Sequence, residues 1–107
     1  MTYKVAVASS DGKVVNRHFG HAEHFLIFEV VGNSYRFVES RKTQRYCHDQ
    51  SHGQSTAALD AIADCKAVLV SQIGPGAIEN LKVRGVESHV LPDLIERALA
   101  DYIQKTV

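Results

Sequence analysis

The sequence predicts an α/β fold, because short apolar segments dominate its first part and alternate with helical patterns after about residue 55. Turn signals separate these segments: Ser-Ser-Asp-Gly at 9–12, Gly-Asn at 32–33 and Ile-Gly-Pro-Gly at 73–76. Three strands followed by alternating helices and strands give the order βββαβαβα, without an internal repeat. With 107 residues in total, we expect a single domain over residues 1–107.

The first half is expected to be antiparallel β. Three apolar segments with turn signals between them are typical of strands, and they cover residues 3–8, 25–31 and 35–40. An Asp-Gly pair after the first segment supplies the positive backbone dihedrals of a tight turn. Gly32-Asn33 fits a two-residue hairpin turn. Strict alternation in the third strand then predicts Tyr35, Phe37 and Glu39 on one side.

The second half is expected to alternate helix and strand. Its predicted elements are a helix over about 56–64, a buried strand at 67–70, a helix after Pro75, a strand at 86–91 and a last helix opened by Pro92. The apolar stripe of that last helix contains Leu94, Ile95, Ala98, Leu99, Tyr102 and Ile103. Between the halves, residues 41–54 form a polar loop with Cys47, His48 and His52, and loops of this length are usually functional or mobile.

Strand directions predict which loops meet. If the first three strands are antiparallel neighbours and the fourth returns by a right-handed crossover, the first, third and fourth strands share one carboxyl edge. Ligands bind at such an edge where the direction of sheet growth reverses. The connections at 9–24, 41–54 and 71–76 would gather there, so that His18 faces the same space as the loop with Cys47. Cys65, just before its strand, belongs at the opposite edge and is expected to pack in the core.

Composition excludes several classes of protein. Twelve basic and twelve acidic side chains cancel, so nothing indicates a nucleic-acid partner. No apolar run approaches the roughly 20 residues that cross a bilayer, and the amino terminus does not resemble a secretory signal. The two cysteines are therefore expected as reduced thiols in a cytoplasmic protein without a membrane role.

Histidine provides the strongest functional clue. Three of the six histidines lie within seven residues, His18-Phe19-Gly20-His21-Ala22-Glu23-His24. Imidazole is a common transition-metal ligand and a proton carrier near neutral pH. If residues 20–24 make one helical turn, His21 and His24 spread over one flank of it and are more suited to support than to ligation.

Several features of the chain together resemble one known family. They are Ser10-Asp11-Gly12, Asn16-Arg17-His18-Phe19-Gly20, Phe25-Leu26-Ile27, Cys47, Asp64-Cys65 and Ile73-Gly74. The chain resembles the nitrogenase iron-molybdenum cofactor biosynthesis family, which includes NifX and the carboxyl-terminal domain of NifB, over essentially its whole length. The resemblance implies a ribonuclease-H-like fold with a mixed five-stranded sheet flanked by helices. It also implies a non-catalytic role, connected with nitrogen fixation, in binding iron-sulfur or iron-molybdenum clusters during cofactor assembly.

The resemblance makes His18 the first candidate ligand, because it matches the histidine of the family's His-Phe-Gly motif. Cys47 offers a thiolate, and His48 and His52 would complete a mixed site that holds its cluster transiently. The predicted supporting residues are Asn16, Arg17, Phe19, Gly20, His21 and Gly74, the last at a helix amino terminus that favours anions. Arg17, Arg41, Lys42 and Arg45 add positive charge near this edge.

Other interpretations remain open at this point. His18 can instead bond its own loop, and Cys47 can be an unreactive thiol. A metal-dependent nuclease needs grouped carboxylates, whereas Asp11, Glu29 and Glu39 form no evident group. The chain lacks the Cys-x-x-x-Cys-x-x-Cys pattern of radical-SAM enzymes, so we expect no catalysis. The expected partners are the cluster cargo and cofactor-assembly proteins. The alternative is a regulatory or scaffolding domain that binds a protein and no cluster.

Overall fold

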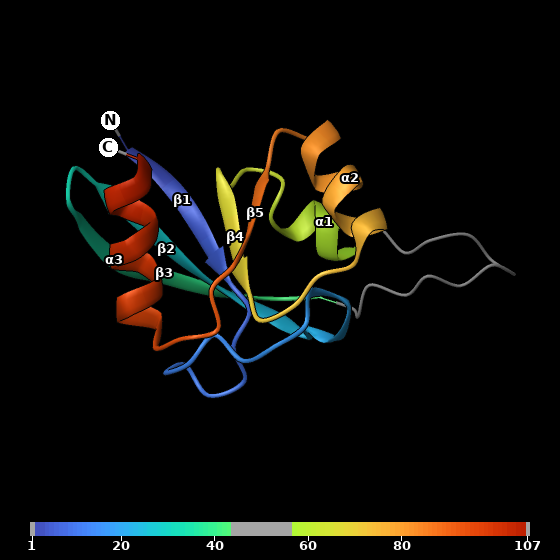
Figure 1. The fold of residues 1–107 in the computed structure, drawn as a ribbon, viewed down its shortest axis with the longest axis horizontal. Helices are drawn as coiled ribbons and strands as arrows, with labels where there is room; N and C mark the ends of the chain where they lie inside the picture. Colours follow the sequence, from blue (N-terminus) through green and yellow to red (C-terminus); the bar gives the residue numbers. More distant parts are fainter. Residues whose placement is uncertain (1, 44–56, 107) are drawn as a thin grey trace, which may run out of the picture.

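A computed structural model describes residues 2–43 and 57–106 of the chain. Along the sequence the elements are β1 (Thr2–Val7), the 3₁₀ turn η1 (Phe19–His21), β2 (His24–Val31), β3 (Ser34–Lys42), α1 (Ala57–Ala61), β4 (Ala67–Val70), α2 (Pro75–Val83), β5 (Glu87–Val90) and α3 (Ile95–Thr106) (Figure 1). The protein is thus an α/β chain with one mixed sheet.

The five strands form a single sheet in the order β3-β2-β1-β4-β5. β2 is antiparallel to both β1 and β3, whereas β4 is parallel to both β1 and β5. The predicted strand directions are confirmed, including the placement of β4 beside β1. Since β1 leads to β2 on one side and β4 leads to β5 on the other, sheet growth reverses between β1 and β4, where ligands commonly bind.

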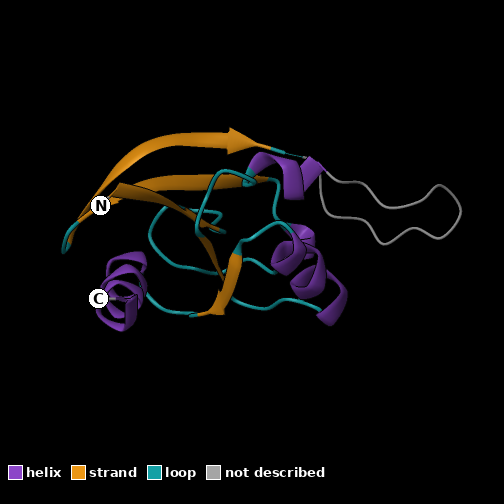
Figure 2. Cartoon of the chain, turned by 90° about the horizontal axis from the view of Figure 1, so that it is seen from above, coloured by secondary structure: helices purple, strands orange, loops and turns teal. Residues whose placement is uncertain are grey.

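Helices cover both faces of the sheet, with α1 and α2 on one side and α3 on the other (Figure 2). Alternation along β1 separates the two cores: Ala6 and Ala8 face α1 and α2, and Val5 and Val7 face α3. The core beneath α3 also takes in Val15, Phe28, Val30, Ala67, Leu69, Ile95, Ala98, Leu99, Tyr102 and Ile103. Burial of each large apolar side chain in these layers contributes about 1.5–3 kcal/mol to the free energy of unfolding. This more than offsets the low intrinsic stability of short helices.

Two predicted turns have the backbone that their glycines suggested. Gly12 has φ of 76° after β1, and Gly32 has φ of 60° between β2 and β3. Both values lie in the left-handed region, which glycine enters without the steric cost of a Cβ atom. The hairpin turn thereby fixes the pairing of Val31 with Ser34.

The third strand differs from the prediction in one respect. The pairing shifts register between Phe28↔Phe37 and Ile27↔Glu39, which leaves Val38 as an extra residue. Tyr35 and Phe37 consequently accompany Phe28 on the α3 side, whereas Glu39 lies opposite Ile27 on the other face. The expectation of all three side chains on one side is wrong because a β-bulge reverses the alternation that follows it.

Two helices are shorter than expected. α1 ends at Ala61, not Asp64, because the chain turns there and Cys65 N donates to Ile62 O at 3.0 Å. α3 begins at Ile95, not at Pro92, after the Asp93 carboxylate accepts a hydrogen bond from Leu94 N at 2.7 Å. Within the two described ranges, no helix is long and apolar enough to cross a membrane.

Candidate functional site

The loop that carries His18 is bonded to the carboxyl ends of β1 and β4. Arg17 N donates to Ala8 O at 3.3 Å, and Ser71 N donates to Arg17 O at 3.0 Å. Phe19 N donates to Gln72 O at 2.9 Å, and His18 forms a parallel bridge with Gln72. The connections after β1 and β4 therefore meet at the predicted edge, with His18 where sheet growth reverses.

Phe19 anchors this loop in the core. Its side chain is fully buried, and its ring centroid lies 5.8 Å from that of Phe25 on β2. Ala22, which follows η1, is also fully buried and donates its N–H to Phe19 O at 3.4 Å. The two neighbours of His18 therefore contribute differently. Arg17 bonds through its backbone and has an exposed side chain, whereas Phe19 fixes the turn to the sheet.

His18 itself is half-buried and caps η1. Its Nδ1 accepts a hydrogen bond from Gly20 N at 2.9 Å. An accepting Nδ1 carries no proton, so the neutral ring carries its proton on Nε2 in this arrangement. The structure therefore contains the loop hydrogen bond of the alternative interpretation. Metal binding at Nδ1 would replace that bond, and metal binding at Nε2 would require the other tautomer.

Asn16 holds the preceding loop together through its side-chain amide. Its Oδ1 accepts from Ser10 N at 2.9 Å and its Nδ2 donates to Ser10 Oγ at 3.0 Å. In the same loop the Asp11 carboxylate accepts backbone N–H bonds from Lys13 and Val14, and these lower the pKa of Asp11. Asn16 therefore supports the shape of the loop that leads to His18.

The amino terminus of α2 lies at the same edge. Gly74 is its N-cap, with an extended backbone and no side-chain cap, and Pro75 occupies the first helical turn. Gly74 follows Gln72, the bridge partner of His18, by two residues. The predicted helix start beside the histidine loop is confirmed, which leaves the positive end of the α2 dipole near this edge.

The remaining candidates divide into two groups. Cys47, His48, His52 and Arg45 lie outside the described residues, as does the side chain of His21. His24 is the first residue of β2 and pairs with Lys42, and η1 ends at His21, so residues 20–24 do not make the single helical turn considered above. Among the residues whose placement is described, no group of three His, Cys, Asp or Glu side chains could hold a metal ion.

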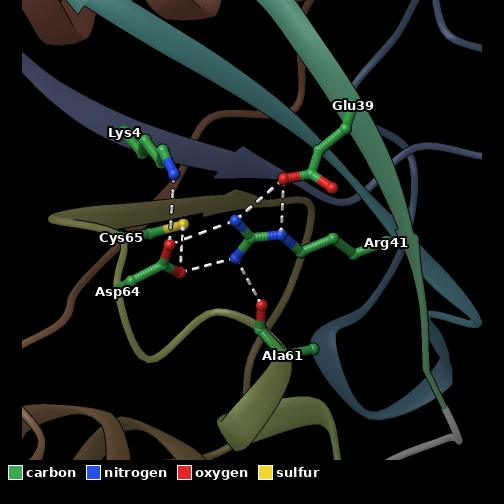
Figure 3. Close-up of polar contacts among 6 residues, drawn as sticks. All are labelled: Lys4, Glu39, Arg41, Ala61, Asp64 and Cys65. Atoms are coloured by element: carbon green, nitrogen blue, oxygen red, sulfur yellow. Dashed lines mark hydrogen bonds and ion pairs between the residues drawn. The ribbon is translucent and has the colours of Figure 1, made fainter.

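Arg41 has partners that sequence reasoning missed. Its guanidinium forms a bidentate pair with Asp64, contacts Glu39 Oε2 at 3.0 Å and donates to Ala61 O at 2.9 Å (Figure 3). Lys4 Nζ adds a contact of 3.4 Å to Asp64. These contacts raise the pKa of Arg41 and, chiefly through the Arg41 hydrogen bonds, lower the pKa of Asp64 to about 2. Two carboxylates balance Arg41, which is not a free cation available to cargo.

Cys65 is part of the core, as expected. Its exposed fraction is 4%, and its Sγ lies 3.8 Å from Asp64 Oδ1. Burial, with the neighbouring Asp64 charge, raises the pKa of the thiol to about 12. A thiol that stays protonated at neutral pH is a poor nucleophile and a poor metal ligand.

The comparison with protein families decides the affiliation. Residues 1–105 match the family described as dinitrogenase iron-molybdenum cofactor. The chain belongs to this family. Among curated relatives, it is 39% identical over 102 residues to the FeMo cofactor biosynthesis protein NifB of Frankia alni, covering 91% of this chain and 20% of that protein. It is 34% identical over 106 residues to the NifB of Azotobacter vinelandii, covering 92% and 21%.

The chain therefore spans about a fifth of the length of these NifB proteins. Solved structures agree in fold. The crystal structure of PH0822 has a TM-score of 0.71 at 26% identity, covering 95% of this chain and 89% of that one. An NMR structure of a candidate NifB protein from Thermotoga has a TM-score of 0.67 at 19% identity, covering 95% and 88%. At the latter identity the likeness shows the fold alone.

Proposed function

We propose that this member of the iron-molybdenum cofactor family is a non-catalytic carrier that binds an iron-sulfur or iron-molybdenum cluster, or a precursor, with His18 as the principal protein ligand. The observation that carries the proposal is the position of His18. A buried phenylalanine and backbone bonds to Gln72 hold it where sheet growth reverses. A metal ligand needs this kind of fixed backbone, because each ordered donor otherwise costs conformational entropy on binding.

The chemistry of the described donors suits a cargo more than a resident ion. A bare transition-metal ion needs three or four protein ligands, whereas a preassembled cluster brings its own sulfides and leaves few iron positions open. One imidazole at an edge shared by two connections fits the second case. The positive end of α2 beside it would favour a cluster with net negative charge.

The hydrogen bond from Gly20 N to His18 Nδ1 supports transient binding. A metal that binds Nδ1 displaces a bond worth about 1 kcal/mol, and a metal that binds Nε2 requires a tautomer in which Nδ1 no longer accepts from Gly20. In both cases the loop hydrogen bond competes with the cargo. Release is therefore assisted by the same loop that holds the ligand.

We also propose further ligands, partners and a location for this carrier. Cys47, His48 and His52 are the expected additional ligands, and assembly proteins that deliver or receive the cluster are the expected partners. A ribonuclease-H-like classification, one domain over residues 1–107 and a cytoplasmic location belong to the proposal as well. The family membership and the mixed sheet support it, and the activity of the five-fold longer NifB relatives is not part of it.

The test is anaerobic reconstitution with iron and sulfide, followed by iron and sulfide analysis, visible absorbance and electron paramagnetic resonance. Wild-type protein should bind iron in stoichiometric amounts with charge-transfer absorbance, and His18→Ala should lose most of both. His89→Ala is the matched control, because the ring of His89 on β5 lies 4.9 Å from the Tyr102 ring and contacts Glu87, and His89 is not part of the His18 loop.

Different results would reject the carrier function, the role of His18 and the non-catalytic character. Wild-type protein that takes up no iron or preassembled cofactor would favour the regulatory or scaffolding alternative. Equal iron and sulfide in wild-type and His18→Ala protein would retain a cluster but remove His18 as its ligand. Turnover of a substrate by the isolated chain would contradict the non-catalytic part.

A further inference from the structure

The β2–β3 hairpin leaves large apolar side chains exposed on the α3 side of the sheet. On this side the exposed fraction is 55% for Phe37 and 37% for Tyr35. Phe28 packs edge-to-face against Tyr35 and Phe37, with centroid distances of 5.9 and 5.7 Å. Contiguous apolar surface of this kind is uncommon on a monomer and usually marks an interface.

Two hollows border this aromatic cluster, and Tyr35 lines both. One, of about 380 Å³, lies near the start of α3 and is also lined by Phe28, Leu94 and Ile95. The other, also of about 380 Å³, lies along the later turns of α3 and is lined by Asn33, Ala100 and Ile103. Because α3 leaves the β3 side of this face uncovered, the hollows and the aromatic side chains form one open apolar surface.

β3 also ends the sheet. Within the described ranges, no further strand pairs with its outer edge, although the strand is nine residues long. Charged side chains often protect such edges from association. Here the arginines of β3 are drawn over the opposite face of the sheet: Arg36 contacts Glu29 at 2.7 Å, and Arg41 binds Asp64 and Glu39. These contacts hold the arginine side chains on that face and leave the aromatic side of β3 without an arginine.

We propose that this surface binds a second copy of the same chain, with the two β3 strands antiparallel across a twofold axis. When the pairing is centred between Phe37 and Val38, Arg36 of each copy comes opposite Glu39 of the other. The bulge places Arg36 and Glu39 on the same face, so the two charges meet twice in the dimer. On the α3 side, the Phe37 side chains of the two copies come together beside the twofold axis, and Tyr35 of each copy lies opposite Ser40 of the other.

The charge on the whole molecule does not oppose self-association. The formal net charge is zero at neutral pH, so two copies do not repel each other at long range. A continuous sheet through β3 would add backbone hydrogen bonds to the aromatic contacts. Interfaces of ordinary size have dissociation constants from micromolar to picomolar, which sets the concentrations that a test must cover.

The test measures molecular mass by sedimentation and light scattering up to about 100 µM protein. Wild-type protein should have twice the chain mass of 11.8 kDa. Phe37→Glu should dissociate it. Arg36→Glu should weaken association by about tenfold, and Arg36→Glu with Glu39→Arg should restore it. Val83→Lys is the control, because Val83 is 83% exposed at the end of α2, away from the hairpin, and should leave the mass unchanged.

A wild-type mass of 11.8 kDa over the whole range would overturn the proposal and leave the surface for a different protein. A dimer that survives both Phe37→Glu and Arg36→Glu would also overturn it, because the contact would then lie elsewhere. Circular dichroism establishes that each variant folds. Should Phe37→Glu fail to fold, the masses of Arg36→Glu and of the double variant with Glu39→Arg decide whether the dimer forms through β3.

Discussion

The His18 loop and the Cys65 junction, which is the turn between α1 and β4, each contain a residue type that binds metals. The two residues differ in burial and in their surroundings. His18 is half-buried at the carboxyl edge of β1 and β4, with its ring oriented by Gly20 N. Cys65 lies before β4, buried in the core, and the pKa of its thiol is raised to about 12. A ligand residue is available for cargo only where burial and neighbouring charge leave its donor form accessible.

The two sites are also held in place by different kinds of contact. Backbone hydrogen bonds to β1 and β4 position the His18 loop. The Cys65 junction is closed by Arg41, Asp64, Glu39 and Lys4, and this network covers the thiol from the polar side (Figure 3). Substitutions at the first site should therefore change cargo binding, and substitutions at the second should change stability.

Phe19→Ala should have the largest effect, because it removes the anchor that holds the His18 loop to the core. Truncation of a fully buried phenylalanine costs about 3–5 kcal/mol in free energy of unfolding. Urea denaturation measures this loss, and iron uptake should fall together with it. His18→Ala should lower iron uptake with a change in unfolding free energy of less than about 1 kcal/mol. A Phe19→Ala protein as stable as wild type would show that the loop is not anchored through the core.

Cys65→Ala should lower stability without changing cluster binding. Loss of a small buried side chain should lower the unfolding free energy by about 1–2 kcal/mol, as measured by urea denaturation. Iron and sulfide per chain after reconstitution should equal the wild-type values, since a protonated, buried thiol is no ligand. A fall in iron content comparable to that of His18→Ala, in folded protein, would contradict the assignment of Cys65 to the core.

Asp64→Asn should have the smallest effect, and one that depends on pH. The folded pKa of Asp64, about 2, lies below the unfolded value of about 3.9, so its contribution is present above pH 4 and is lost as the pH falls toward 2. Because the Asp64 side chain is 50% exposed, we expect a loss of only about 1 kcal/mol at pH 7. Urea denaturation at pH 7 and at pH 2.5 should show the variant and wild type converging in acid. An undiminished difference at the lower pH would contradict the ion pair as its cause.

Much of the fold follows from local sequence patterns. Apolar periodicity located the strands and helices, and Gly12 and Gly32 marked turns whose backbone the structure contains. The bulge at Val38 was not predicted, because the position of an extra residue depends on how β2 and β3 pair and not on either strand alone. Leu94 was expected in the apolar stripe of the last helix but precedes α3 and is exposed, since the residues around Asp93 delay the helix start.

The candidate site was predicted in part. Strand directions placed the histidine loop and the turn before α2 at one edge, and hydrogen bonds between them are present. The roles of neighbouring residues were harder to predict. Asn16 bonds within its own loop, and Arg41 pairs with Asp64 across 23 positions of sequence, a contact that no local pattern could reveal. The predicted ligands Cys47, His48 and His52 remain predictions.

The amino-acid order alone determined the element types, the strand directions and the membership of a cofactor-assembly family, because these depend on periodicity, turn chemistry and short motifs. Only the three-dimensional structure decided which potential ligands are accessible. Burial keeps the Cys65 thiol protonated, an ion-pair network neutralises Arg41, and backbone bonds between two distant connections fix His18. Accessibility and charge balance depend on contacts between residues that are far apart in the chain, and these contacts exist only in the folded protein.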